Sequence, residues 1–151
     1  MRGIVKIIAF GMLVALLGSG FCLISCGPRT DFRGIWSGKR PGKAPDGVPS
    51  YEWASISEVK LYVYDNGRFD LMNMGLPKSG TIVVEGNKAT LTVTKIANQD
   101  VSRQTDETKA TIGPIEVVKQ PDGTVIFSDP KSADPSKVVL KQTATSAKDR
   151  S

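Results

Sequence analysis

The chemistry open to this chain is limited by its side chains, and the most distinctive of them is the thiol of Cys26. Cys26 follows a long apolar run and precedes Gly27 and Pro28, and the only other cysteine, Cys22, lies inside that run. The chain has no histidine. Zinc sites of the Cys/His kind are therefore excluded, and we expect no metal site. What Cys26 does depends on the nature of the run before it.

The apolar run covers residues 4–24, and Lys6 is its only charged residue. Arg2 and Lys6 give it a positive start, which is the beginning of the three-part plan of a secretory signal peptide. The end of the run is marked by small residues, namely Gly18, Ser19, Gly20 and Ser25. An uncleaved transmembrane helix needs about 20 apolar residues, so the run also permits that alternative. We predict a cleaved signal peptide over residues 1–25.

The four residues Leu23, Ile24, Ser25 and Cys26 resemble the lipobox of bacterial lipoproteins. The resemblance implies that the Cys26 thiol is acylated with diacylglycerol, that cleavage follows Ser25, and that the new amino group is open to palmitate-type acylation. It also implies a lipid-anchored protein of the cell envelope. Because Gly27 and not Asp follows the cysteine, it implies the outer membrane, facing the periplasm, in a Gram-negative host. The alternative is an ordinary buried cysteine.

The charge of the predicted mature chain is modest. Without residues 1–25 it carries 18 basic and 15 acidic residues, a formal charge of +3. Nucleic-acid binding requires a concentrated basic face, so we expect no nucleic-acid partner. With one cysteine left, a disulfide within the mature chain is also excluded.

Residue pairs that could catalyse a reaction do not fit their sequence context. Ser57 and Lys60 have the Ser-x-x-Lys spacing of penicillin-recognising enzymes, but in an alternating strand they point to opposite faces. Asp106 and Glu107 are adjacent carboxylates in a polar stretch, and adjacency does not place them across a scissile bond. We expect no enzyme, no catalytic residue and no cofactor, unless the fold creates a carboxylate arrangement that the sequence does not reveal.

The elements expected around these residues are strands joined by tight turns. Asn66-Gly67 permits positive φ at both central positions, which predicts a type I′ hairpin turn. Gly86 and Gly123 mark two further turns. Side chains alternate, with Val59 and Leu61 on one face and Lys60 on the other. The predicted strands are 32–37, 55–64, 68–74, 80–85, 88–96, 115–120, 124–129 and 137–141.

This pattern predicts an all-β fold, a small antiparallel meander of about eight strands closed into a barrel. A two-sheet β-sandwich would satisfy the same pattern. We expect residues 26–31 to be a lipidated cysteine and short linker, residues 32–141 the barrel and residues 142–151 a disordered tail. Two long loops interrupt the strands, residues 37–53 and 97–110, and no helix is expected in either.

The pentapeptide FRGIW at residues 32–36 resembles the Gly-x-Trp opening of lipocalins and related calycin barrels. In that family the tryptophan closes the barrel floor and a basic residue from the last strand lies across its indole. The resemblance therefore implies barrel-floor packing by Gly34, Trp36 and Lys141, or Lys137 in place of Lys141. Trp36 as an ordinary core aromatic, with Gly34 relieving crowding beside it, is the alternative.

Two functions are compatible with these features. The first is a binding module that holds a small apolar ligand or envelope component between its strands, in an interior cavity of about 300 Å³ or more. The second is an adaptor lipoprotein that docks a protein partner through a sheet face or through the loop at residues 37–53, which carries Tyr51 and Trp53. A group of basic residues is also hypothesised to lie over anionic head groups: Arg29, Arg33, Lys39, Arg40 and Lys43.

Overall fold

The computed structural model describes residues 31–44, 46–132 and 134–148. The predicted signal peptide and Cys26 lie outside these residues. The strands are β1 (Gly34–Lys39), β2 (Glu58–Val63), β3 (Arg68–Asn73), β4 (Leu76–Glu85), β5 (Lys88–Ile96), β6 (Gln99–Asp100), β7 (Ile115–Lys119), β8 (Val125–Ser128) and β9 (Val138–Ala144). The helices are α1 (Ser50–Ile56), the 3₁₀ turn η1 (Val101–Arg103) and α2 (Asp106–Ala110).

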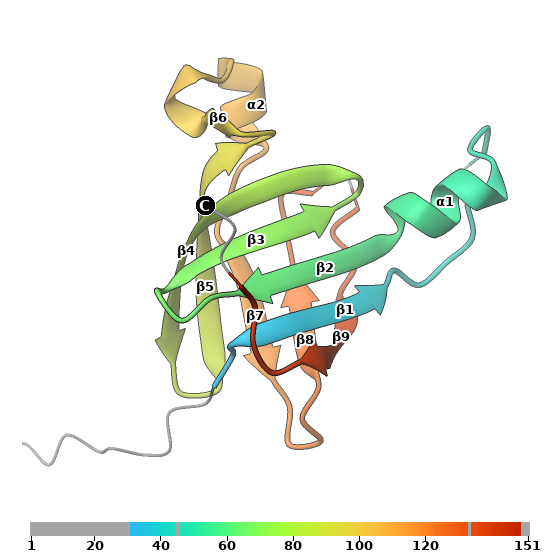
Figure 1. The fold of residues 1–151 in the computed structure, drawn as a ribbon. Helices are drawn as coiled ribbons and strands as arrows, with labels where there is room; N and C mark the ends of the chain where they lie inside the picture. Colours follow the sequence, from blue (N-terminus) through green and yellow to red (C-terminus); the bar gives the residue numbers. More distant parts are fainter. Residues whose placement is uncertain (1–30, 45, 133, 149–151) are drawn as a thin grey trace, which may run out of the picture.

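The sheet closes on itself (Figure 1). Apart from the two-residue β6, each strand pairs antiparallel with the next strand along the chain, and β9 returns to pair with β1. The β4–β5 pairing, from Lys78 and Ile96 to Glu85 and Lys88, completes the ring. The predicted all-β barrel of eight antiparallel strands is confirmed, and the sandwich alternative is wrong because closure leaves no second sheet.

The turns form at the predicted places, with one difference in geometry. Between β2 and β3, the amide of Gly67 donates to the carbonyl oxygen of Tyr64 at 3.3 Å, and Tyr64 N donates to Arg68 O at 3.0 Å. Gly67 has φ +76°, whereas Asn66 is not among the residues with positive φ. The predicted type I′ turn is therefore wrong. A left-handed glycine closes a longer turn instead, and the Asn66 side chain accepts from Arg68 N at 3.1 Å.

Side chains of alternating residues fill the barrel. Val59, Leu61 and Val63 point inward along β2, as their spacing predicts. The largest fully buried side chains come from seven different strands: Trp36, Phe69, Phe127, Leu61, Leu71, Leu91, Ile115, Leu140, Val59, Val117, Val125 and Val138. Burial of such side chains contributes roughly 1.5–3 kcal/mol each, so this packed interior is the main source of stability.

Two helices occupy the loops in which none is expected. Both are short and contain no buried residue, so neither has the apolar stripe that would mark a helix in sequence. Helix α1 projects from the side of the barrel (Figure 1), and it delays the start of the second strand from the predicted residue 55 to Glu58. In the part of the chain that the structure describes, no helix is long and apolar enough to cross a membrane.

The last strand is longer than predicted. Strand β9 continues to Ala144, where residues from 142 onward are expected to form a disordered tail. Gln142 pairs with Trp36 and Ala144 pairs with Ile35, so these polar residues are held by the backbone of β1. These residues are ordered because they pair with β1, which their polar composition does not predict.

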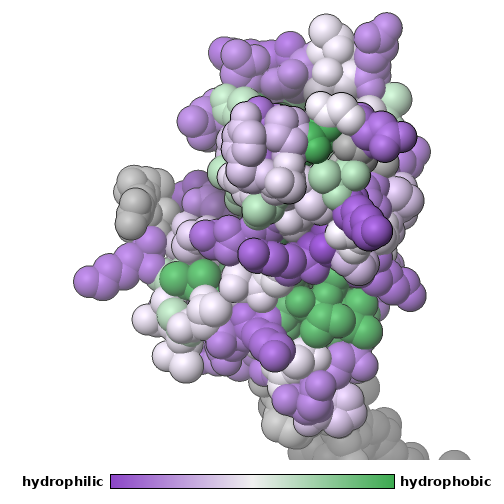
Figure 2. Space-filling view, turned by 90° about the vertical axis from the view of Figure 1, so that its right-hand side faces the viewer, coloured by the Kyte–Doolittle hydropathy of each residue, from purple (hydrophilic) through white to green (hydrophobic). Residues whose placement is uncertain are grey.

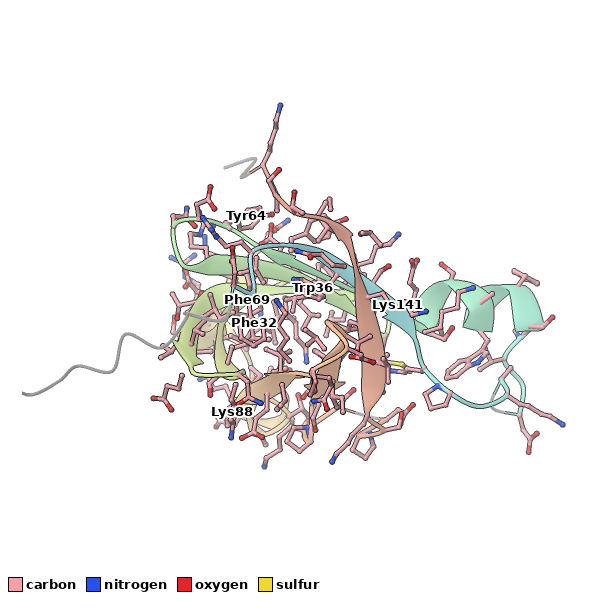
Figure 3. All side chains as sticks on the ribbon, turned by 90° about the horizontal axis from the view of Figure 1, so that it is seen from below. Phe32, Trp36, Tyr64, Phe69, Lys88 and Lys141 are labelled. Atoms are coloured by element: carbon pink, nitrogen blue, oxygen red, sulfur yellow. The ribbon has the colours of Figure 1, made fainter. Side chains whose placement is uncertain are left out.

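The chain enters the barrel by crossing one end of it, which is the closed end (Figure 3). Phe32 is buried there, and the indole Nε1 of Trp36 donates to the carbonyl oxygen of Phe32 at 2.7 Å. The ammonium of Lys119 donates to the carbonyl oxygen of Asp31 at 2.8 Å and lies 5.4 Å from the centre of the Trp36 ring. These contacts form a floor beneath the core.

The cation over Trp36 is therefore Lys119 of β7, and the expectation that Lys141 occupies this place is wrong. Strand β9 points Val138 and Leu140 inward, so Lys141 faces outward by alternation and is exposed. Lys141 lies opposite Ser37, on the outer wall. Lys137 is exposed before β9 begins. A lysine can lie over the indole only if its side chain points to the inside of the barrel. Lys119 does so in β7, whereas Lys141 in β9 does not.

Gly34 is required by the approach of β9. Its φ is +115°, and a Cβ at this position would lie 2.2 Å from the carbonyl oxygen of Ala144. Any side chain would therefore push the end of β9 away from β1. Gly34, two residues before Trp36, therefore allows β9 to approach β1 closely enough to close the sheet.

We predict that Lys119→Met lowers the free energy of unfolding by about 0.5–2 kcal/mol, the range of a cation–π contact, because it removes the charge over Trp36. The matched variant Lys141→Met should leave it unchanged within about 0.5 kcal/mol, as expected for an exposed site. Urea unfolding followed by circular dichroism measures both. A larger loss for Lys141→Met than for Lys119→Met would contradict this assignment.

Candidate functional site

The predicted site residues fall in three places. Leu23, Ser25 and Cys26 lie outside the described residues. Gly34 and Trp36 meet at the closed end of the barrel, and Lys141 lies on the outer wall.

The basic residues expected to form one face are separated by the length of β1. Arg33 precedes β1 at the closed end, where it pairs with Asp31 at 2.6 Å and Asp65 at 3.4 Å. Its side-chain hydrogen bond is the main cause that lowers the pKa of Asp31. Lys39 and Arg40 come at the opposite end of β1, and Arg40 is buried. Arg29 lies outside the described residues. The described basic residues are divided between the two ends of β1, so they do not form the hypothesised single face.

Arg40 belongs to a buried polar network at the end opposite the floor, which we call the open end. Its Nη2 donates to Asn73 Oδ1 at 2.7 Å. Its Nη1 donates to the carbonyl oxygen of Asp134 at 2.7 Å and lies 3.3 Å from the carboxylate of the same residue. The guanidinium is fully buried, so these partners replace its water.

The network continues from Asn73 to a buried ion pair. Asn73 Nδ2 donates to Asp129 Oδ2 at 3.0 Å, and Lys78 Nζ donates to the same oxygen at 2.8 Å. The Asp129 side chain is 1% exposed and that of Lys78 is 9% exposed. A buried pair of this kind gives little net stability, because desolvation of both charges offsets their attraction. The network therefore calls for a role other than stability.

Alternation along the strands explains how these residues meet. Asn73 continues the inward series of Phe69 and Leu71 in β3, and Asp129 continues the inward series of Val125 and Phe127 in β8. Lys78 pairs with Leu71 across β3 and β4. Asn73 and Asp129 thus take the next inward position after an apolar column, and with Arg40 and Lys78 they form a polar layer across the open end.

Two buried atoms of this layer have no partner among the described residues, Nε of Arg40 and Oδ1 of Asp129. Most buried polar atoms in folded proteins are hydrogen-bonded, so such atoms call for an explanation. The Lys78 ammonium has three donors, and among the described residues it donates to Asp129. The open end therefore holds hydrogen-bonding capacity that the fold does not use.

A pocket of about 330 Å³ lies beside this polar layer, and we call it the rim pocket. Asn73 and Lys78 belong both to the network and to the pocket wall. The apolar part of the wall consists of Met74, Leu76, Ile96 and Ile112. Helix α2, which contributes Thr108, covers one side, and the loop after β8, with Lys131 and Ser132, covers another.

The charged residues that line the rim pocket are both lysines, Lys78 and Lys131. The stem of Lys131 is packed over Gly113, where a Cβ would lie 2.6 Å from Lys131 Cγ. An apolar wall with two ammonium groups suits a ligand with an apolar body and an anionic head. In the described residues, no group of three or more histidine, cysteine or acidic residues is placed to hold a metal ion.

Hydrogen bonds favour the charged form of one acid of the network, Asp134. The backbone amide of Ser136 donates to the Asp134 carboxylate at 2.9 Å, and this bond is the largest cause that lowers the pKa of Asp134. The contribution of Asp134 to stability is therefore present above the ordinary carboxylate pKa and is lost as the pH falls through the lowered pKa of the folded state.

The sequence signal for the site is the polar residue at an inward position. In β3 and β8 the apolar alternation ends on Asn73 and Asp129, and this could have been read from the strand pattern. The meeting of these residues with Arg40 and Lys78 depends on barrel closure and could not. Neither models of known protein families nor curated proteins match the chain, so the functional argument rests on this geometry.

We predict that Asp129→Ala lowers the free energy of unfolding by about 3–5 kcal/mol, because it leaves Lys78 buried without its counter-charge. The double variant Asp129→Ala/Lys78→Met should recover part of this loss, since the uncompensated charge is removed. Urea unfolding measures the three proteins. Asp46→Ala, at an exposed aspartate, is the matched control with an effect within about 0.5 kcal/mol. Equal losses at positions 129 and 46 would show that the network carries no strong coupling.

Proposed function

We propose that this protein is a lipid-anchored binding module of the cell envelope that takes a small ligand with an apolar body and an anionic head in the rim pocket. The observation that carries the proposal is the shared position of Lys78, which is held by buried Asp129 and at the same time lines an apolar pocket. A lysine fixed in this way is oriented before the ligand arrives, so little freedom is lost on binding.

The attachment to the envelope rests on the lipobox. Acyl chains on Cys26 would hold the protein at a membrane, because each buried methylene contributes about 0.8 kcal/mol and two or three chains give stable residence. In a Gram-negative host this is the outer membrane, facing the periplasm. The chain enters at the closed end, so the rim pocket opens roughly 20 Å away, at the far end of six-residue strands.

The packed interior favours the rim over the middle of the barrel as the place for a ligand. Trp36, Phe69 and Phe127 occupy the space that a larger barrel leaves open. The rim pocket, of about 330 Å³, lies at the lower end of the range for small-molecule sites. In the proposed complex, Leu76 and Ile112 contact the apolar body, and Lys78 and Lys131 bind the anionic head.

The probe for this function is 1-anilinonaphthalene-8-sulfonate, an aromatic anion whose fluorescence rises in an apolar site. Residues 27–151 should bind it at one saturable site. Leu76→Glu and Lys131→Glu should each weaken binding at least tenfold, about 1.4 kcal/mol, because each places a negative charge in the pocket wall. Fluorescence titration gives the dissociation constants.

The matched controls lie on the outer wall. Val139→Glu is the counterpart of Leu76→Glu, since both residues are exposed apolar side chains. Lys95→Glu, at an exposed position of β5, is the counterpart of Lys131→Glu. Both should leave the dissociation constant unchanged. Binding that is absent in the wild type, or weakened equally by the controls, would contradict the rim pocket as a ligand site.

One observation favours a second function, that of an adaptor for a protein partner. Tyr51 is 73% exposed on α1, a helix that contains no buried residue and projects from the barrel. The molecular face viewed from that side is mainly hydrophilic with small apolar patches (Figure 2). A photoreactive residue at position 51 should then crosslink one specific envelope protein in cells, whereas the same residue at exposed Val139 should not. Identical patterns at both positions would exclude this function.

A further inference from the structure

The hairpin of β4 and β5 extends beyond its neighbour at the closed end. Pairing between β3 and β4 ends at Arg68 and Thr81, while β4 continues to Glu85. Val83 and Val84 lie on this extension and are 57% and 42% exposed. We call this segment, residues 82–87, the hairpin tip. These two adjacent exposed valines do not belong to the buried core of the barrel.

The hairpin tip lies beside the point where the chain enters the described structure (Figure 1). Ile82 and Val84 line a cleft of about 630 Å³ together with Asp31, Phe32 and Arg33 of the incoming chain. The amide of Ile82 donates to the carbonyl oxygen of Gly67 at 3.0 Å, which ties the tip to the neighbouring turn. The tip and the incoming chain therefore share one end of the molecule.

The charges around the hairpin tip are largely paired. Arg33 contacts Asp31 and Asp65, and Lys88 contacts Glu116 at 2.7 Å. Lys119 is engaged by Asp31 O and Trp36. Among the described residues, these three cations are therefore already engaged, and Val83 and Val84 are exposed apolar side chains beside the exposed Glu85.

The chain before Asp31 limits how far this end can lie from a membrane. Four residues separate Cys26 from Asp31. Even when fully extended, the chain from Cys26 to Asp31 spans at most about 18 Å. If Cys26 carries the lipid, as the proposed function requires, the closed end stays within that distance of the head groups.

We propose that the hairpin tip is a second membrane contact, in which Val83 and Val84 insert among the head groups of a phospholipid bilayer. This inference rests on the proposed lipid anchor at Cys26. The contact is apolar, so it is insensitive to salt and does not require anionic lipid. It fixes the barrel with its floor toward the bilayer and its rim pocket away from it.

The mature lipidated protein allows a direct test, because it has no free thiol. Cleavage of the signal peptide removes Cys22, and the lipid occupies the thiol of Cys26. Val83→Cys then introduces a single free thiol, which is labelled with the environment-sensitive dye acrylodan. In vesicles of phosphatidylethanolamine and phosphatidylcholine, its emission should shift to the blue and be quenched by spin-labelled lipids. Addition of about 0.5 M salt, which screens exposed charges, should leave the blue shift unchanged.

The matched control is Val139→Cys, because Val139 is also an exposed valine, 54% accessible, on the outer wall of β9. Its dye should show neither shift nor quenching. Hydrogen exchange on the wild-type protein provides a second measurement, since vesicle binding should slow exchange at residues 82–87 without any substitution.

The outcomes separate the two proposals. A protein that does not float with the vesicles has no lipid anchor, which overturns the proposed attachment and this inference with it. A protein that floats, but whose dye at position 83 behaves like that at position 139, keeps its anchor and overturns the membrane contact of the hairpin tip. A shift that salt abolishes would also overturn it, because the contact would then be electrostatic.

Discussion

Closure of the sheet through the pairing of β9 with β1 is the constraint on which the rest of this molecule depends. Once the ring is closed, every second residue of eight strands must point into the same interior. That interior is too narrow for anything except side chains. The inward-pointing residues at each end of the strands therefore decide whether that end is apolar or polar.

The two ends differ because the inward columns end differently. At the closed end the column finishes on Trp36 and Phe32, and Lys119 lies over the indole. At the open end it finishes on Arg40, Asn73 and Asp129, which are linked by hydrogen bonds through Asn73. An apolar floor excludes water, whereas a charged layer keeps polar groups next to a pocket. The same closure thus gives the molecule one apolar end and one end with a buried polar layer beside a pocket.

Burying the charges of the polar layer costs desolvation free energy, and this suggests a role other than stability. Replacing buried ion pairs by apolar residues is often neutral or stabilising, so a core built only for stability does not need Lys78 and Asp129. The pair holds a lysine at the edge of the rim pocket with a defined orientation. Preorganisation of this kind is how a small pocket gains affinity without a large contact area. The hairpin tip differs from this layer, because Val83 and Val84 are partly exposed and lie outside the buried core cluster.

Local pattern was sufficient for the architecture. Alternation and turn residues predicted the all-β barrel, most strand positions and the inward faces, because both are set by a period of two along the chain. Local pattern failed for α1 and α2, which contain no buried residue, and for the end of β9, where polar Gln142 pairs with Trp36 and donates from its side chain to Arg33 O. These elements depend on neighbours that are distant in sequence.

The residues of the site divide in the same way. The sequence by itself determined that an indole and a nearby glycine open the first strand, that histidine is absent, and that an apolar run is followed by a cysteine. Only the tertiary structure decided that Lys119 and not Lys141 covers Trp36, and that Arg40, Asn73, Lys78 and Asp129 meet. The reason is that strand order and register set which distant side chains share one end of a closed barrel, and a single strand carries no record of its partners.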